Sequence, residues 1–354
     1  MAGGIGSRFW PISRDKHPKQ FLDILSTGKS LLRQTFERFA SICPKENIYV
    51  VTNESYVDLV KQQLPELTDH QVLGEPMRRN TAPCIAYASY KIAQINPDAN
   101  MVVAPSDHVI TNEKAFHEAI AHAFDFTEKE DSLVTLGIHP SRPDTGYGYI
   151  QFKEDASKKD TLRVLKVKTF TEKPNLEMAK FFMKSGDFVW NSGIFIWNAK
   201  AIMQAMEDHL PEINNIFKEG TSFYNTDKEA DFIRTAYAHC TNISIDYGVM
   251  EKAKNVYVLA TEFGWSDLGT WRSLYDQLPH DQQANAVVGL HVMLEQTSNC
   301  IINMPNNKLA VIQGLNDFIV VETDNVLLIC PKQDEQQIRQ LVNDVKIKKG
   351  EKYI

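Results

Sequence analysis

The chain begins with a glycine-rich turn that positively charged side chains follow, "MAGGIGSRFWPISRDKHPKQF". Gly3, Gly4 and Gly6 allow backbone amides to point inward at an anion. Two arginines and a lysine come at short range after them: Arg8, Arg14 and Lys19. Guanidinium forks and an ammonium suit phosphate oxygens, so the combination predicts a triphosphate-binding loop. It is neither a Walker A loop nor a GxGxxG fingerprint, because no GK[ST] follows and position 9 is Phe.

Two aspartates each follow a segment that is expected to be a strand. Asp107 lies in "VVAPSDHVI" and Asp267 lies in "FGWSDLGTW". Open α/β sheets bind ligands at this edge, and Mg²⁺ typically needs only one or two protein carboxylates. The alternative interpretation is a cap or turn aspartate in each case. The spacing leaves open whether the two side chains meet.

A third group of residues has the chemistry of a sugar-phosphate site. "FTEKPN" contains Glu172 and Lys173, and "WNSGIFIWN" contains Asn191 in an otherwise apolar segment. Lys173 suits a phosphate, and Glu172 with Asn191 suits vicinal hydroxyls, which need both acceptors and donors. A solvated ion pair and a turn cap explain the same residues equally well. Gly146 and Gly148 in "DTGYGY" fit a hairpin.

The segment "GEPMRRNTAPCIAY" has the residues of a helix start. Asn80 or Thr81 is the expected N-cap, and Pro83 fits the first turn. Glu75 and the two arginines before Asn80 remain available for a ligand.

The elements that position these residues alternate along the chain from residue 31 to about residue 140. The pattern predicts helices over 30–43, 82–95 and 113–124, and strands over 47–53, 100–105 and 132–138. Such alternation predicts a parallel sheet with right-handed crossovers. Later strands are expected over 146–152, 164–172 and 188–198, as an antiparallel extension at the sheet's edge, and over 255–261 as a core strand.

A polar segment, "LPHDQQANAVVG", interrupts the pattern and places a domain boundary near residue 282. We therefore expect a catalytic domain over residues 1–281 and a small β domain over residues 282–354. The second domain contains short strands at close spacing and a final amphipathic helix over 335–346.

Composition excludes several classes of protein. The 354 residues are 43% hydrophobic and 23% charged, and the net charge of −7 argues against nucleic-acid or membrane-surface binding. The five cysteines are widely spaced and form no CxxC pair, which argues against a disulfide framework or a zinc site. We expect buried thiols in a reducing cytoplasm. No apolar run reaches membrane-spanning length, and there is no signal-peptide pattern.

Taken in order, nine motifs resemble the mannose-1-phosphate guanylyltransferases, also called GDP-mannose pyrophosphorylases. They are AGGxGSRxWPxSR, PKQF, EPxxRNTAP, SDH, GYGYI, FxEKP, WNSGIF, DYGVME and WSDLGTW, between residue 2 and about residue 275. The resemblance implies an α/β fold, with a Rossmann-like mixed-sheet nucleotidyltransferase domain of the GT-A kind and a small C-terminal domain like a left-handed β-helix. The chain is similar to the short form, which lacks a C-terminal phosphomannose isomerase domain.

The resemblance also implies roles for individual residues. The GTP phosphates would be held by Gly3, Gly4, Gly6, Arg8 and Lys19, and the guanosine by Glu75, Asn80 and Thr81. Mannose 1-phosphate would be bound by Gly148, Glu172, Lys173 and Asn191. Asp107 and Asp267 would be the ligands of Mg²⁺ or another divalent cation such as Mn²⁺, and the catalytic set would be Arg8, Lys19, Asp107 and Asp267. The resemblance further implies a homodimer, formed through the β domain, that binds neither nucleic acid nor membrane.

The implied reaction is in-line attack by a phosphate oxygen of mannose 1-phosphate on the α-phosphorus of GTP, giving GDP-mannose and pyrophosphate. The nucleophile is already an anion, so no general base is required. Catalysis then depends on positioning and on neutralisation of charge.

Three alternatives stay open at this point. The first is the same chemistry on another pair of substrates, as in GDP-heptose or dTDP-glucose synthesis. The second is a regulatory homologue that only senses GDP-mannose, whose mark would be loss of Arg8, Lys19, Asp107 or Asp267, and all four are present. The third is a metal-dependent glycosyltransferase, but the sequence has no DxD motif at an expected strand end.

The sequence departs from the family pattern at its start. Family members carry an apolar strand that ends at the residues numbered Met1 and Ala2 here. A central strand of ~5–6 residues buries several side chains. The free energy lost with this strand should exceed a typical free energy of unfolding of ~5–15 kcal/mol. We therefore expect the natural start to lie upstream, with Met1 inside that strand. Mass spectrometry of the native protein tests this, and Met1 or Ala2 as the mature N-terminus would contradict it.

Overall fold

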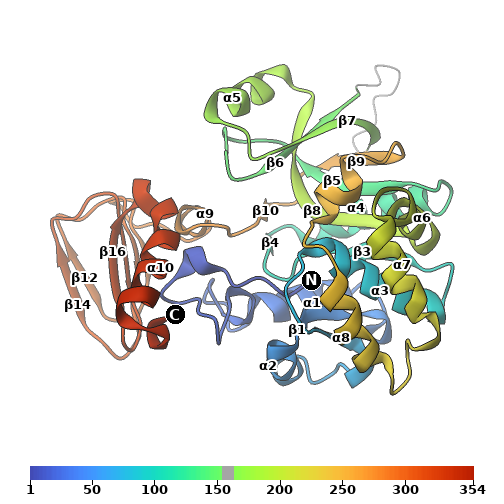
Figure 1. Cartoon of the computed structure of the whole chain (residues 1–354). Coiled ribbons are helices and arrows are strands. Elements are labelled where there is room, and N and C mark those ends of the chain that lie inside the picture. The colour runs from blue at the N-terminus through green and yellow to red at the C-terminus, as the bar shows by residue number, and fades with distance from the viewer. Residues whose placement is uncertain (154–162) are drawn as a thin grey trace. The chain divides into compact units, whose positions relative to one another are not determined.

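The computed structural model describes residues 1–153 and 163–354, and these form two compact units (Figure 1). Unit 1 contains Met1–Gly3, Arg38–Pro105 and Ile110–Trp265. Unit 2 contains Gly4–Glu37, Ser106–Val109 and Ser266–Ile354. The chain therefore enters unit 2 three times, and each unit is described by itself below.

Unit 1 is built on a six-stranded mixed sheet. Its strands, in spatial order, are β3 (Asn100–Val103), β8 (Phe188–Asn198), β5 (Leu133–Ile138), β9 (Val256–Thr261), β7 (Val164–Glu172) and β6 (Gly148–Phe152). β8 is antiparallel to both β3 and β5, β5 is parallel to β9, and β7 is antiparallel to β6 and β9. All six residues of β5 are buried, as expected of a strand that is covered on both faces.

The order of the strands corrects one expectation. We expected β8 at the edge of a parallel sheet, whereas it lies between β3 and β5. Its apolar side chains on both faces explain this position, because a strand buried on both sides reads as a continuous apolar run. The antiparallel extension expected over 146–172 is confirmed, since β6 pairs antiparallel with β7 and also with the start of β8.

The strand expected over 47–53 does not join the large sheet, because it lies in a second, smaller sheet of unit 1 beside a strand that we did not expect. β1 (Val50–Asn53) pairs in parallel with β2 (Val72–Glu75). The first residues of the chain lie beside it: the Ala2 amide donates to the Val51 carbonyl at 2.7 Å. The terminal ammonium of Met1 donates to the Ala104 carbonyl, just beyond β3, at 2.8 Å. Met1 and Ala2 thus connect the small sheet to the end of β3.

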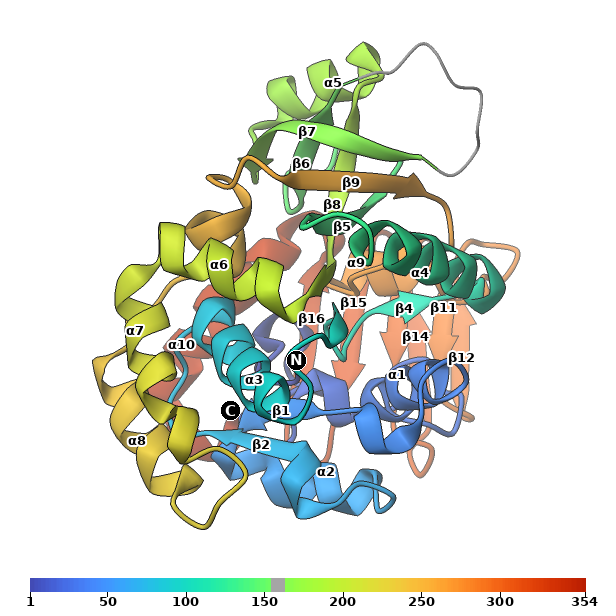
Figure 2. The same cartoon turned by 90° about the vertical axis from the view of Figure 1, so that its right-hand side faces the viewer.

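Helices cover both faces of the large sheet. The helices of unit 1 are α2 (Val57–Gln63), α3 (Thr81–Ile95), α4 (Glu113–Thr127), α5 (Leu176–Ser185), α6 (Ala199–His209), α7 (Pro211–Glu219) and α8 (Glu229–His239). Helices α3, α6 and α7 pack on one another, with α8 beside α7 (Figure 2). They share a core with Leu133 and Trp197, whereas α4 shares a core with Val134 and Ile196 on the opposite face.

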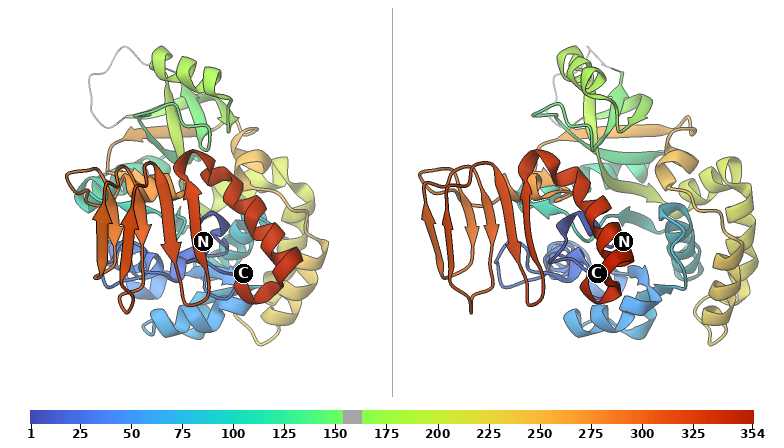
Figure 3. Two further views of the ribbon diagram at one scale, coloured as in Figure 1. Left: turned by 90° about the vertical axis from the view of Figure 1, so that its left-hand side faces the viewer. Right: turned by 60° about the vertical axis from the view of Figure 1, so that its left-hand side comes forward.

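Unit 2 contains the β-rich C-terminal segment. β11 (Ala286–Val288), β13 (Ile301–Asn303) and β15 (Phe318–Glu322) pair in parallel, and β16 (Leu327–Pro331) adds an antiparallel edge. β12 (Val292–Glu295) and β14 (Ala310–Gln313) form a second parallel pair. A small core that includes Cys300 and Ile302 fills the space between the two sheets. Stacked parallel strands of this kind are typical of a β-helix (Figure 3), which confirms the expected fold class.

The glycine-rich loop and the C-terminal helix share one core in unit 2. Helix α10 (Ile338–Lys349) lies beside the β-helix strands in Figure 3, and its Ile338 packs in a cluster with Phe9, Trp10 and Trp271. The remaining elements are α1 (Leu31–Ala40), α9 (Trp271–Tyr275), β4 (Val109–Ile110), β10 (Trp265–Ser266), several short 3₁₀ segments and the short π-helix η7 (Asp246–Met250). Strands β4 and β10 pair with each other.

The structure bears on the expected state of the cysteines and on the search for membrane-spanning helices. All five cysteines are free thiols, and four of them are buried, while Cys43 is partly exposed. Among the described residues, no helix combines the length and the apolar character that crossing a membrane requires.

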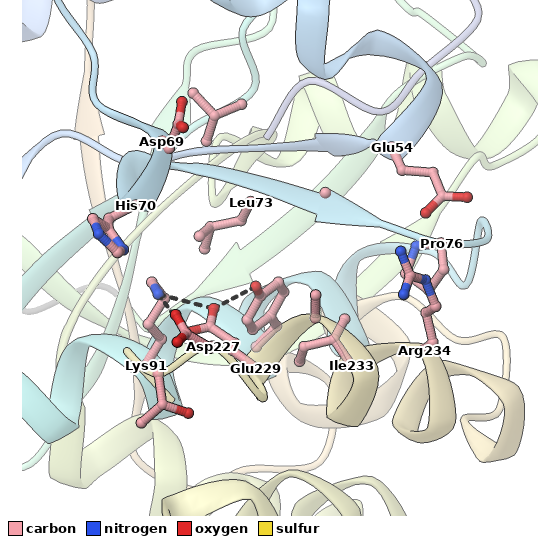
Figure 4. A pocket seen from close by; sticks show the side chains of 15 residues that line it. Glu54, Asp69, His70, Leu73, Pro76, Lys91, Asp227, Glu229, Ile233 and Arg234 are labelled. Atoms are coloured by element: carbon pink, nitrogen blue, oxygen red, sulfur yellow. Dashed lines mark hydrogen bonds and ion pairs between the residues drawn. The ribbon is translucent and has the colours of Figure 1, made fainter. Parts of the chain in front are cut away.

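A buried ion pair joins two helices of unit 1 (Figure 4). The Lys91 ammonium on α3 is 2.8 and 2.6 Å from the two carboxylate oxygens of Glu229 on α8. Glu229 also accepts from the Tyr87 hydroxyl at 2.6 Å and from the backbone amide of Asn225 at 2.6 Å. The side chains of Lys91 and Glu229 are 2% and 12% exposed, so each depends on the other for compensation of its charge.

We expect Lys91→Met to lower the free energy of unfolding by roughly 3–5 kcal/mol, because it leaves Glu229 as an unpaired buried charge. The double variant Lys91→Met/Glu229→Gln removes both charges and should recover at least half of this loss. Urea denaturation measures both effects. The exposed pair Lys218–Glu207 provides the control: Lys218→Met should cost less than about 1 kcal/mol. A double variant no more stable than Lys91→Met would contradict this account.

Candidate functional site

In unit 2, Lys19 is the residue that connects the predicted catalytic segments. It is 4% exposed and begins the short turn η2 (Lys19–Phe21) directly after Pro18. Its ammonium lies 2.8 Å from Asp107 Oδ2 and donates to the backbone carbonyls of Asp267 at 2.9 Å and Leu268 at 3.0 Å. An ammonium has three N–H donors, and all three have an acceptor here. Lys19 therefore holds the two aspartate-bearing segments next to each other.

Asp107 remains negatively charged in this environment. Burial raises the pKa of the Asp107 carboxyl, but the Lys19 ammonium and then His108 outweigh burial and hold the pKa below its ordinary value. The ring nitrogen Nε2 of His108 is 3.9 Å from Asp107 Oδ1. Asp267 Oδ1 accepts from the Gly269 amide at 2.8 Å, in the turn that leads to α9.

The two aspartates fit a hard divalent cation. Mg²⁺ prefers oxygen ligands and usually takes one or two carboxylates together with water and substrate phosphates. The part of the chain that the structure describes has no cluster of three or more His, Cys, Asp or Glu suited to a metal ion. Two carboxylates are the protein contribution expected for a Mg²⁺ ion that takes its other ligands from water and substrate phosphates.

The residues that follow the glycine-rich loop in the sequence determine its backbone conformation. Gly6 has a φ of +62°, and a Cβ there would lie 2.6 Å from Lys19 Cβ. The Gln20 side chain donates to the Gly4 carbonyl at 3.0 Å, and the Ser13 hydroxyl donates to the Ile5 carbonyl at 2.7 Å. Residues 13–20 thus set the course of the backbone over residues 4–6.

The two arginines of this motif differ in what they contact. Arg8 has a buried Nε that no hydrogen-bond acceptor among the described residues satisfies. Arg14 donates to Thr323 Oγ1 at 2.8 Å and to Asn325 Oδ1 at 2.7 Å, in the turn between β15 and β16. We grouped Arg14 with the phosphate-binding residues, whereas in the structure it anchors the loop to the β-helix.

In unit 1, Glu75 and Gly3 lie close together. Glu75 ends β2, and a Cβ built on Gly3 would lie 3.4 Å from Glu75 Oε2. The Tyr237 hydroxyl donates to Glu75 Oε1 at 2.9 Å. Burial raises the pKa of Glu75 to about 7, although the Tyr237 hydrogen bond and the terminal ammonium act in the opposite direction.

Asn80 and Thr81 form the start of α3. Asn80 has a φ of +67° and accepts from the Thr81 amide at 3.0 Å, so it is the N-cap. The Thr81 hydroxyl accepts from the Ile245 amide at 2.8 Å. The preceding arginines are also engaged, Arg78 with the Tyr56 hydroxyl at 2.8 Å and Arg79 with a backbone carbonyl of α8 at 3.1 Å.

The four residues predicted for the sugar phosphate come together in unit 1. Glu172 at the end of β7 is paired with Gly148 of β6, and a Cβ on Gly148 would lie 2.5 Å from Glu172 Oε2 and 3.5 Å from Asn191 Cβ. Any side chain at position 148 would therefore displace the Glu172 carboxylate from this position. Lys173 has a φ of +46° and forms an ion pair with Glu172. Asn191, on β8, donates to Asp246 at 2.7 Å.

Asp246 is a polar neighbour of this group that the sequence analysis did not assign. The motif DYGVME was singled out there, but none of its residues received a role. The only sequence signal was an aspartate at the start of an otherwise apolar turn.

Unit 1 contains a cavity of about 370 Å³ (Figure 4). It is lined by residues of β2, α3 and α8, including the Lys91–Glu229 pair. None of the predicted site residues is among those that line it. The residue chemistry, and not the presence of a cavity, therefore identifies the candidate site.

The family model of the nucleotidyl transferases matches residues 1–284. The chain belongs to this family. A second family model, of a MannoseP isomerase/GMP-like beta-helix domain, matches residues 289–345. Membership establishes a nucleotidyltransferase enzyme, as the motifs predicted.

Individual relatives are similar over nearly the whole chain. A mannose-1-phosphate guanylyltransferase of Salmonella muenchen is 36% identical over 98% of this chain and 72% of its own length. The alginate biosynthesis protein AlgA of Pseudomonas aeruginosa is 35% identical over 98% of this chain and 71% of its own. A crystal structure from Thermus thermophilus, described as a mannose-1-phosphate geranyltransferase, has a TM-score of 0.86 and 29% identity, with 98% of each chain covered. The resemblance to mannose-1-phosphate guanylyltransferases is confirmed.

The pKa of Glu75 makes a prediction about stability. An unfolded glutamate ionises near pH 4.5, whereas Glu75 in the folded chain ionises near pH 7. Between these values the folded state binds more protons, so the contribution of Glu75 to stability falls as the pH rises. Glu75→Gln imitates the protonated form and should be more stable than wild type at pH 8, by on the order of 3 kcal/mol, with little difference at pH 4.5.

Urea denaturation at the two pH values measures this difference. The exposed Glu46→Gln serves as the control and should show no dependence on pH of this kind. Equal stability of Glu75→Gln and wild type at pH 8 would show that the burial of Glu75 carries no cost.

Proposed function

We propose that the chain transfers GMP from GTP to α-D-mannose 1-phosphate, giving GDP-mannose and pyrophosphate. The observation that carries this proposal is the contact of Lys19 with Asp107 and with the backbone of Asp267, beneath a glycine loop that Gly6 shapes. The relatives named mannose-1-phosphate guanylyltransferase support the choice of substrates.

The loop residues bind the GTP phosphates. Backbone amides of Gly3, Gly4 and Gly6 donate to phosphate oxygens, and the unsatisfied N–H of Arg8 adds a charged donor. Lys19 has all of its donors occupied without substrate, so its first task is to fix the position of the two aspartates. Its positive charge also lowers the cost of placing phosphates nearby.

Asp107 and Asp267 are the proposed ligands of Mg²⁺ or Mn²⁺. A cation held by these carboxylates would supply positive charge that offsets the charge of the phosphates. The ionised state of Asp107, which Lys19 maintains, keeps this ligand available across the neutral pH range.

The sugar phosphate is bound by residues of unit 1. Lys173 contacts its phosphate, while Glu172 and Asn191 contact its hydroxyls and Gly148 leaves the space for them. A phosphate oxygen of the sugar phosphate attacks the α-phosphorus of GTP, and the bond to the pyrophosphate leaving group breaks. This oxygen is already negative, so no residue has to remove a proton.

Glu75, Asn80 and Thr81 are the proposed guanosine residues. Guanine presents N–H donors on one edge, and the carboxyl of Glu75 is an acceptor that suits them. A homodimer and a cytoplasmic location, expected from the sequence, stay predictions.

Pyrophosphate release from GTP and mannose 1-phosphate in the presence of Mg²⁺ tests the proposal. ATP, dTTP and glucose 1-phosphate serve as alternative substrates in the same assay. Selective release with GTP and mannose 1-phosphate supports it. Turnover with a different pair assigns another sugar nucleotide, and silence of a folded chain with every pair leaves only a binding role.

We expect Lys19→Met to lower kcat by about 10²–10³-fold, because it removes a positioned charge and frees both aspartate segments. The exposed Lys16, three residues earlier, is the control, and Lys16→Met should keep full activity. Thermal denaturation accompanies the assay, since Lys19→Met leaves Asp107 without its partner. The double variant Lys19→Met/Asp107→Asn removes that unpaired charge, so it should be the more stable of the two while remaining inactive. Activity near wild type in Lys19→Met would refute the role of Lys19.

A further inference from the structure

Asp246 holds a side chain of the sugar-phosphate group in one orientation. It begins the short π-helix η7 (Asp246–Met250), and its Oδ1 accepts from Asn191 Nδ2 at 2.7 Å. At the other end of the same amide, Asn191 Oδ1 accepts from the Gly193 amide at 3.1 Å and from Thr135 Oγ1 at 3.3 Å. An amide group has two N–H donors, so one of them remains for a ligand. The hydrogen bond to Asp246 therefore fixes the orientation of the Asn191 amide, with its N–H groups toward Asp246.

The position of Asp246 is itself fixed by the start of α3. The Ile245 amide donates to the Thr81 hydroxyl at 2.8 Å, and the Ala82 amide donates to the Ile243 carbonyl at 3.1 Å. Farther along η7, Val249 and Met250 are buried in the core that also contains α3. A continuous series of contacts thus runs from Thr81, which we propose for the guanosine, through Asp246 to Asn191, which we propose for the sugar.

The surroundings of Asp246 are acidic. Burial raises the pKa of the Asp246 carboxyl, the hydrogen bond from Asn191 lowers it, and the charge of Glu172 raises it again. Glu251, just after η7, has its pKa raised by burial and then by Asp246 and Glu172. These carboxylates offer hydrogen-bond acceptors, and a ligand with several hydroxyl donors satisfies them better than an anion does.

We propose that Asp246 is the positioning residue of the sugar subsite, which holds the Asn191 amide so that its free N–H is presented to a sugar hydroxyl. This inference rests on the proposed function and adds a residue to it. Asp246 acts through Asn191 and not on the reacting phosphates. It should therefore affect recognition of the sugar phosphate and leave recognition of GTP unchanged.

Steady-state pyrophosphate release with Asp246→Ala and Asp246→Asn tests the proposal. Asp246→Ala removes the acceptor and should raise the KM for mannose 1-phosphate at least about tenfold, with the KM for GTP within about twofold of wild type. Asp246→Asn retains a carbonyl acceptor for Asn191 and should recover most of this loss. Glu262→Gln is the control, because this exposed carboxylate follows β9, has no place in the proposed site and should leave both KM values unchanged.

Four results would overturn the proposal, and they differ from one another. Equal increases in both KM values, or a lower kcat with unchanged KM values, would show that Asp246 only supports the fold. Failure of Asp246→Asn to recover the KM would show that the charge, and not the hydrogen bond to Asn191, matters. A wild-type chain that uses another sugar 1-phosphate refutes the proposed substrate alone, and the same comparison then applies to that sugar. A wild-type chain silent with every sugar 1-phosphate overturns both proposals.

Discussion

The arrangement of the proposed catalytic segments depends on one buried ammonium. Lys19 donates to the carboxylate of Asp107 and to the backbone carbonyls of Asp267 and Leu268, which lie far from it in the sequence. A buried lysine is tolerated only when its charge and its N–H groups are compensated. The compensation therefore works in both directions: the lysine requires the acceptors, and the segments of Asp107 and Asp267 are held in place by the lysine. Gly6 completes this constraint, because any side chain there would collide with Lys19.

In unit 1, the proposed sugar-phosphate residues are also held in place by close contacts and hydrogen bonds. Glu172 occupies the space that a side chain at Gly148 would fill, and Asn191 is held at both ends of its amide. These side chains come from β6, β7 and β8, which are adjacent strands of one sheet. Strands that are fixed by their ladders and by a core on both faces restrict side chains more than loops do. Recognition of vicinal hydroxyls needs this restriction, since the direction of each donor and acceptor matters.

Much of the fold was predictable because its elements are long and strongly patterned. The helices α3 and α4 and the strands β5 and β8 stand out as periodic or continuous apolar runs. The strand β2 has only four residues and contains Gly74, so it carries no comparable signal. The order of strands was not predictable either, because periodicity shows that β8 is buried on both faces but not which strands flank it.

In the candidate site, the types of the residues were predictable from the sequence, but their partners were not. Residue type suggested Lys19, Asp107 and the sugar-phosphate residues, but it treated Arg14 as equivalent to Arg8 and gave Asp246 no role. The difference lies in the partners, since Arg14 contacts a turn more than 300 positions later in the chain. The electrostatics of the proposed catalytic residues then limits the chemistry. Asp107 is held ionised by a paired lysine, and Glu75, whose pKa lies at about 7, is not one of the proposed catalytic residues. Groups that keep their charge suit the stabilisation of phosphates and are poorly suited to shuttling protons. A transfer whose nucleophile is already an anion is the kind of reaction that such groups can promote.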